Sequence, residues 1–85
     1  MTPTILQEDG YRYFFFSREE PRMHVHVVCA EGEAKFWLEP QIDLAKNYRL
    51  SRRQLKHIEQ VIEANYATFV NAWKTHFRNR SDRDH

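Results

Sequence analysis

The sequence predicts an α+β domain in which a small antiparallel sheet of four to five strands packs against one long C-terminal amphipathic helix. The first half of the chain holds short runs rich in β-branched and aromatic residues, separated by Gly and Pro turn signals. From Leu55 to Phe77, apolar residues recur at three- and four-residue steps with no Gly or Pro between them. Strands followed by a helix are typical of α+β proteins.

The length of 85 residues predicts a single domain over residues 1–80, with 81–85 as a flexible C-terminal tail. No apolar run approaches the roughly 18 residues that span a bilayer, so we expect no membrane segment. The single cysteine, Cys29, excludes an internal disulfide and fits a reducing cytoplasm, where we place the protein. A domain this small buries a limited core, which makes a partner or a second copy a natural source of stability.

The N-terminal segment predicts a hairpin. Strands are expected at Thr4–Glu8 and Tyr11–Phe16, because Asp9-Gly10 between them suits a tight turn with positive φ. The aromatic run of the second strand does not alternate with polar residues, so either both faces are covered or one is a binding surface. We interpret it as core.

Two further strands are predicted at Met23–Ala30 and Glu33–Glu39, joined by a turn at Glu31-Gly32. Side chains alternate between the faces of a strand. One face is therefore the expected core face, carrying Met23, Val25, Val27, Cys29, Ala34, Phe36 and Leu38. The other face, which we expect to project away from the interior, carries His24, His26, Lys35 and Trp37.

The segment Gln41–Leu50 indicates either a short fifth strand or an extended crossing segment before the helix. Ser51 and Gln54 then form a capping box, which predicts the helix start. We expect one long helix over the core face, with Asn65 as the place for a bend. Its apolar stripe overruns a small sheet, so a homodimer or partner contact is expected at Phe69, Trp73 and Phe77.

The paired histidines carry the most capable chemistry. An imidazole has an ordinary pKa of about 6.5, so two neighbouring rings can share general acid and base work. Lys35 and Arg12 are expected on the same face. Together with His24 and His26 they predict the site of a metal-independent ribonuclease, in which the histidines are acid and base and Lys35 steadies the phosphate. Two other interpretations remain open. One is ordinary polar contacts on a half-exposed strand, and the other is a metal site with a third ligand from Glu33, Glu39 or His76.

Other residues suit nucleic acid. Trp37 beside Lys35 could stack a base and neutralise a phosphate, and Arg52, Arg53 and Lys56 lie in the first helical turns, where free amides favour anions. Each has an ordinary alternative, since the tryptophan could pack on neighbours and the basic turns could be merely solvated. Both glycines fall at predicted turns, so no phosphate-binding loop is present and no nucleotide cofactor is expected.

Several short motifs occur together in an order that resembles a known family. They are Gly10-Tyr-Arg-Tyr-Phe-Phe, Pro21 before His24-Val-His-Val, Glu33 through Pro40, Leu50-Ser51, and Ala72-Trp73 through His76-Phe77. The combination resembles the small bacterial proteins designated domain of unknown function 4160, over Thr2 to Phe77. One departure is the loop before the histidines, which has a single proline where the family often has a longer proline run.

The resemblance implies a compact α+β domain, often encoded beside a second small protein in arrangements like toxin–antitoxin modules. The family's most characteristic positions correspond to His24, His26, Lys35 and Trp37, and it has no established activity. We therefore expect a component of such a module that binds its cognate small protein and acts on RNA through the histidine pair. The alternatives are a non-catalytic protein-binding or oligomerising module and a metal-binding protein.

Overall fold

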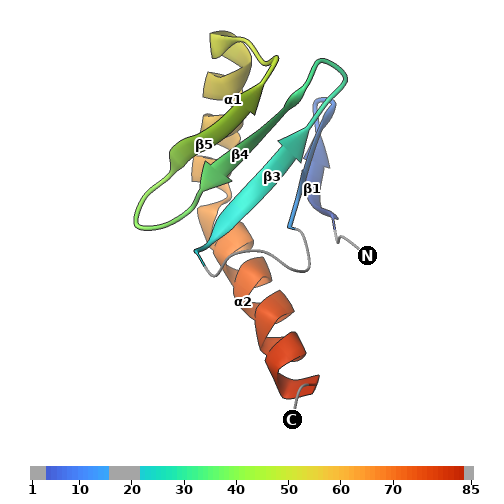
Figure 1. Cartoon of the computed structure of the whole chain (residues 1–85), viewed down its shortest axis with the longest axis vertical. Coiled ribbons are helices and arrows are strands. Elements are labelled where there is room, and N and C mark those ends of the chain that lie inside the picture. The colour runs from blue at the N-terminus through green and yellow to red at the C-terminus, as the bar shows by residue number, and fades with distance from the viewer. Residues whose placement is uncertain (1–3, 16–21, 84–85) are drawn as a thin grey trace.

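The computed structural model describes residues 4–15 and 22–83, with side chains as far as His76. Five antiparallel strands form one sheet in the order β1-β2-β3-β4-β5, and two helices follow (Figure 1). The elements are β1 (Thr4–Glu8), β2 (Tyr11–Phe14), β3 (His24–Val28), β4 (Glu33–Trp37), β5 (Asp43–Tyr48), α1 (Arg52–Ala64) and α2 (Tyr66–Arg83). The predicted α+β class is confirmed. No helix within the described residues is long and apolar enough to cross a bilayer.

The first hairpin forms at the predicted turn. Asp9 and Gly10 have φ angles of 54° and 83°, the left-handed conformation that Asp and Gly tolerate best. Strand β2 ends at Phe14, and the expected last residue of this strand, Phe16, lies outside the described residues. Tyr13 and Phe15 are buried in the core, so the aromatic run is structural on that side.

Strand β5 resolves the ambiguous segment and contains a bulge. Lys35 of β4 opposes Lys46, whereas the next residue, Phe36, opposes Leu44, so Ala45 has no partner. Adjacent residues of β4 point to opposite faces, and therefore Lys46 and Leu44 also do. The bulge places Lys46 on the face that carries Lys35, and Leu44 on the face that carries buried Phe36.

The helices begin and break where the sequence indicated. Both hydrogen bonds of the capping box are present, between the Ser51 hydroxyl and the Gln54 amide and between the Gln54 side chain and the Ser51 amide. The expected single helix is two consecutive helices. At the break, the Asn65 side-chain amide donates to the Val61 carbonyl at 2.8 Å. Helix α2 continues to Arg83, past the predicted start of the tail at residue 81.

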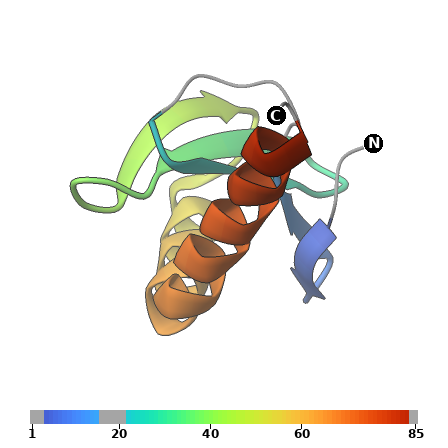
Figure 2. The same ribbon diagram turned by 90° about the horizontal axis from the view of Figure 1, so that it is seen from below.

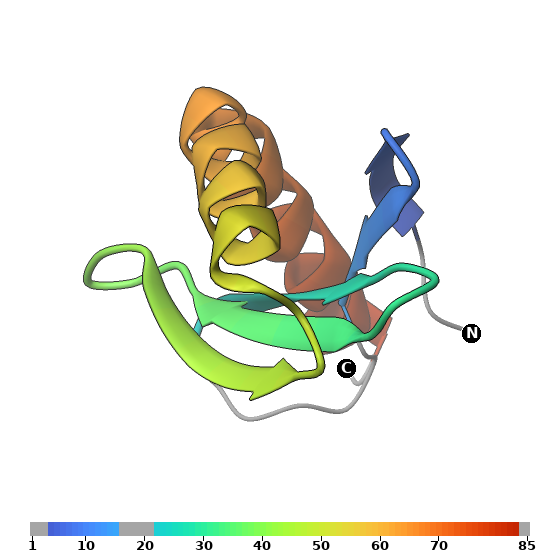
Figure 3. The same ribbon diagram turned by 90° about the horizontal axis from the view of Figure 1, so that it is seen from above.

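Both helices cover the same face of the sheet, and the β1–β2 hairpin curls up beside them (Figures 2 and 3). The Tyr66 hydroxyl donates to the Leu38 carbonyl at 2.5 Å, which ties the start of α2 to the end of β4. The buried core lies between these layers and consists of Tyr13, Phe15, Val25, Val27, Ala34, Phe36, Leu38, Leu50, Ile58, Val61, Ile62, Phe69 and Trp73.

The expectation that Phe69 and Trp73 form a dimer contact is wrong. Their exposed fractions are 0% and 7%, and they pack inside their own chain. Tyr13 lies 5.6 Å from Phe69 and Phe15 lies 5.1 Å from Trp73, measured between ring centroids. Tyr13 of β2 and Phe15 just after it thus cover the part of the helix stripe that was expected to overrun the sheet. The Phe77 side chain lies outside the described residues.

Removing the Tyr13 hydroxyl is expected to leave the free energy of unfolding unchanged or to raise it by about 1–2 kcal/mol. This hydroxyl is buried and has no hydrogen-bond partner among the described residues, and such a group costs stability. Urea unfolding of Tyr13→Phe tests this, with Tyr48→Phe as the exposed control. A decrease of more than about 1 kcal/mol in the free energy of unfolding would contradict this expectation, because removing a group that costs stability should not destabilise the protein.

The same tyrosine predicts a pH dependence. Burial first, and then the charges of Glu8, Tyr11 and Asp9, raise the Tyr13 pKa above its ordinary value near 10. Folding therefore favours the neutral phenol. As the pH rises above about 10, this tyrosine ionises in the unfolded chain, and the free energy of unfolding falls. Unfolding measured at about pH 8 and about pH 10.5 should show a smaller alkaline loss for Tyr13→Phe than for wild type.

Candidate functional site

The sheet face that the helices leave uncovered carries two rows of functional side chains. Strand register places Phe14, His26, Lys35 and Lys46 directly opposite one another from β2 to β5. A second row, displaced by two residues along each strand, contains Arg12, Val28, Glu33 and Tyr48. The prediction that His26, Lys35 and Arg12 share one face is therefore correct.

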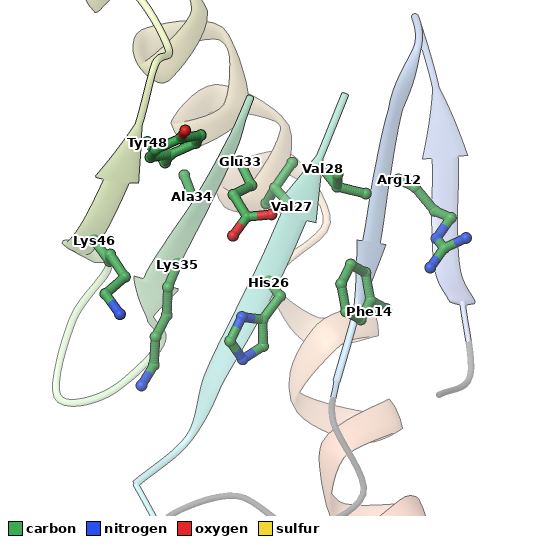
Figure 4. A pocket seen from close by; sticks show the side chains of 10 residues that line it. All are labelled: Arg12, Phe14, His26, Val27, Val28, Glu33, Ala34, Lys35, Lys46 and Tyr48. Carbon is green, nitrogen blue, oxygen red and sulfur yellow. The ribbon is translucent and has the colours of Figure 1, made fainter. Parts of the chain in front are cut away.

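A shallow cavity of about 450 Å³ lies over these rows (Figure 4). We call it the sheet-face basin. Side chains from β2, β3, β4 and β5 line it, and the lining residues that matter chemically are Arg12, Phe14, His26, Glu33, Lys35, Lys46 and Tyr48. Four strands thus contribute to one hollow that no helix covers.

The basin is predominantly basic. It contains three permanent cations, Arg12, Lys35 and Lys46, and one carboxylate, Glu33. Lys35 and Lys46 stand directly opposite each other on neighbouring strands, an arrangement that destabilises a sheet when the charges are alike. A bound anion between them would relieve this repulsion, so the basin suits a phosphate or carboxylate group.

Aromatic rings accompany the cations. Phe14 stacks on the His26 ring with centroids 5.7 Å apart and an angle of 23° between the planes, and the Arg12 guanidinium lies 5.0 Å from the Phe14 centroid. Beside the basin, Trp37 contacts both the Arg22 guanidinium at 4.1 Å and the Lys35 ammonium at 4.5 Å. Each of these rings attracts the positive charge that lies over it, which favours positions of the basic side chains close to the sheet face.

The expectation that both histidines project from the interior is wrong for His24, which is 0% exposed. It opposes Trp37 at the end of the sheet, where the Trp73 ring of α2 lies 5.0 Å away. Its Nδ1 donates to the Arg22 carbonyl at 2.6 Å, and because a carbonyl only accepts, this nitrogen carries a proton. His24 still contacts His26, with centroids 5.2 Å apart, but it is sealed from any substrate.

The structure does not bring Arg52, Arg53 and Lys56 to the basin. These exposed side chains lie on α1, which covers the opposite face of the sheet. Arg52 and Lys56 instead border a separate cavity of about 260 Å³ beside Phe36 and Leu44. Pattern reasoning also missed Lys46 and Tyr48, because simple alternation along β5 fails at the bulge.

No three His, Cys, Asp or Glu side chains form a ligand set within the described parts of the chain. Two of the third ligands considered from sequence lie beside other residues. The Glu39 carboxylate accepts from the Met23 amide at 3.1 Å, and the His76 ring lies 6.5 Å from Phe15, between centroids. The metal interpretation therefore gains no support from this geometry.

The fold and the basin define a small α+β domain with a basic, partly aromatic face on an uncovered sheet. The family model of the Domain of unknown function (DUF4160) matches residues 10–74, and the chain belongs to this family. The resemblance seen in the sequence is thereby confirmed. No curated protein and no solved structure matches the chain significantly.

The two histidines should differ sharply in their effect on stability. His24→Ala is expected to lower the free energy of unfolding by about 2–4 kcal/mol, because it leaves a cavity in the interior and removes the hydrogen bond to the Arg22 carbonyl. His26→Ala should cost about 1 kcal/mol or less, since its ring is only half-buried. Urea unfolding of both variants measures the difference, and equal losses would contradict the burial described above.

Proposed function

We propose that this protein is the RNA-binding component of a bacterial toxin–antitoxin-like pair, and that the sheet-face basin binds the RNA backbone. The observation that carries the proposal is the like-charged pair Lys35 and Lys46, set in one row with His26 and facing Arg12 across the basin. Phosphates neutralise such a cluster, and lysine and arginine provide most of the affinity for nucleic acid backbones.

The shape of the basin favours a chain of nucleotides over a single small anion. Strands lie about 4.8 Å apart, so the row from β2 to β5 spans roughly 14 Å. The Tyr48 ring, 60% exposed at one end of the second row, offers a face on which a base can stack. A hollow with Lys35 and Lys46 in one row, and with Arg12 and the exposed Tyr48 ring in the other, suits single-stranded RNA. A cytoplasmic location agrees with this ligand and with the free thiol of Cys29.

The burial of His24 changes the chemistry that can be proposed. A general acid or base must come within hydrogen-bond reach of the substrate, and this ring cannot. The two-histidine mechanism expected from the sequence is therefore not carried forward. His26 and Lys35 remain at the basin, and the binding role rests on them together with Arg12 and Lys46.

Loss of one basin lysine should weaken RNA binding. Lys46→Gln is expected to reduce the affinity for a 12-nucleotide single-stranded RNA of mixed sequence by about 3–10-fold, and to reduce the magnitude of the salt slope by about 0.7 for one lost phosphate contact. Fluorescence anisotropy at several salt concentrations measures both. Lys74→Gln, an exposed change on α2, is the matched control. Equal effects of the two substitutions would show that binding is not at the basin.

A second proposal concerns the cognate small protein that the family resemblance implies. All six residues of the edge strand β5 are exposed, including Leu44 at 47%. Leu44, Phe36 and Leu55 line the apolar part of a cavity between β5 and α1, and its charged border consists of Arg52, Lys56 and Glu59. An unpaired strand edge beside an apolar cavity suits a partner that adds a strand and inserts an apolar side chain. The border carries two cations and one carboxylate, and this excess of positive charge favours an acidic partner segment.

Partner binding should stabilise the protein through this edge. Mixing the chain with the protein encoded alongside it is expected to raise the melting temperature, since a ligand of the native state stabilises that state. Leu44→Lys should abolish most of the increase while leaving the melting temperature of the isolated chain nearly unchanged, because Leu44 is exposed. An increase of the same size in wild type and variant would place the partner on another surface.

A further inference from the structure

Glu33 occupies an unexpected position for a site that only binds anions. It projects into the basin from β4, where it opposes Val28 of β3 and is therefore a diagonal neighbour of His26. Figure 4 shows its carboxylate extending from β4 toward β3, on the side from which the His26 ring projects. Diagonal neighbours on one sheet face lie roughly 7–8 Å apart, which leaves room for a phosphate between two long side chains.

A carboxylate among cations weakens anion binding, so binding alone does not account for it. An acid–base role does, because phosphodiester transfer needs one group that accepts a proton and another that donates one. A carboxylate and an imidazole are suitable groups for the two tasks. Lys35 and Lys46, in the same row as His26, can neutralise the charge that develops on the phosphate.

We infer that Glu33 and His26 cleave RNA without a metal, in the basin proposed above to bind its backbone. The Glu33 carboxylate takes the proton of a ribose 2′-hydroxyl, and the 2′-oxygen forms a bond to the adjacent phosphorus. The bond from phosphorus to the 5′-oxygen breaks, and protonated His26 gives its proton to that oxygen. The products are a 2′,3′-cyclic phosphate and a 5′-hydroxyl end. Proton exchange with water restores both side chains.

The surroundings of His26 suit a general acid that must be held still. Phe14 stacks on its ring, and the His24 ring meets it edge-on at 85°. His24 is itself fixed by its hydrogen bond to the Arg22 carbonyl. We therefore assign His24 as a positioning residue, which orients the imidazole without touching RNA.

The experiment uses the full chain, the 12-nucleotide single-stranded RNA described above with a fluorescent end label, and excess chelator. Glu33→Gln and His26→Asn are each expected to reduce the cleavage rate by about 100-fold or more, the usual contribution of acid–base catalysis. Glu33→Gln should bind RNA as tightly as wild type or more tightly, because a negative charge is removed. Glu63→Gln, an exposed carboxylate of α1, is the control and should cleave normally.

An all-deoxy strand of the same sequence should be bound and left intact, because it lacks the attacking hydroxyl. Cleaved RNA should carry a cyclic phosphate that phosphatase removes only after acid treatment. RNA that is bound but not cut by wild type, or cut equally by Glu33→Gln, would overturn this inference and leave the binding proposal intact. Absence of RNA binding would overturn both.

A separate experiment tests whether His24 orients the His26 ring. His24→Asn should lower the cleavage rate while leaving RNA affinity within about twofold, at a temperature where unfolding data show the variant to be folded. The NMR signals of the His26 ring should shift or broaden in this variant. An unchanged rate with an unchanged His26 spectrum would restrict His24 to a structural role.

Discussion

The contact between two aromatic residues at the end of β2 and just beyond it, Tyr13 and Phe15, and two aromatic residues of α2 organises this molecule. Tyr13 and Phe15 meet Phe69 and Trp73 with centroids 5.1–5.6 Å apart, and all four side chains are buried. This contact holds the helices on one face of a five-stranded sheet, and the other face is left uncovered. It also brings Trp73 against His24, so the same packing that builds the core removes one histidine from the surface.

The bulge in β5 is the second constraint on the site. One extra residue, Ala45, reverses the faces of the residues before and after it. Lys46 is thereby placed beside Lys35 in the basin, and Leu44 is placed beside Phe36 in the cavity near α1. A single backbone irregularity thus supplies a cation to one surface and an apolar contact to another, and the two proposed binding surfaces depend on it.

The basin illustrates how like charges can indicate function. Opposed lysines on neighbouring strands lower the stability of a sheet, and a glutamate in the centre of a basic hollow lowers its affinity for anions. Both features make sense if the ligand is a phosphodiester, whose charge offsets the lysines and whose reaction requires a base. A purely structural sheet face would gain stability by losing the like-charged pair.

Short-range signals were sufficient for much of the fold and part of the site. The Asp9-Gly10 turn, the Ser51 cap and the alternation along β3 and β4 depend on neighbouring residues, so they were readable in the sequence. The same alternation correctly grouped His26 with Lys35. It identifies the face on which a side chain lies, but it carries no information about what covers that face.

The remaining features depend on contacts between segments distant in the chain. His24 is buried because Trp73, 49 positions later, packs against it. Phe69 and Trp73 are core residues because β2 reaches them, and Lys46 joins the basin because the pairing of β4 with β5 accommodates an extra residue. Periodicity along one segment describes that segment alone. Burial and strand register arise when segments meet, and for this reason they emerge only in the folded chain.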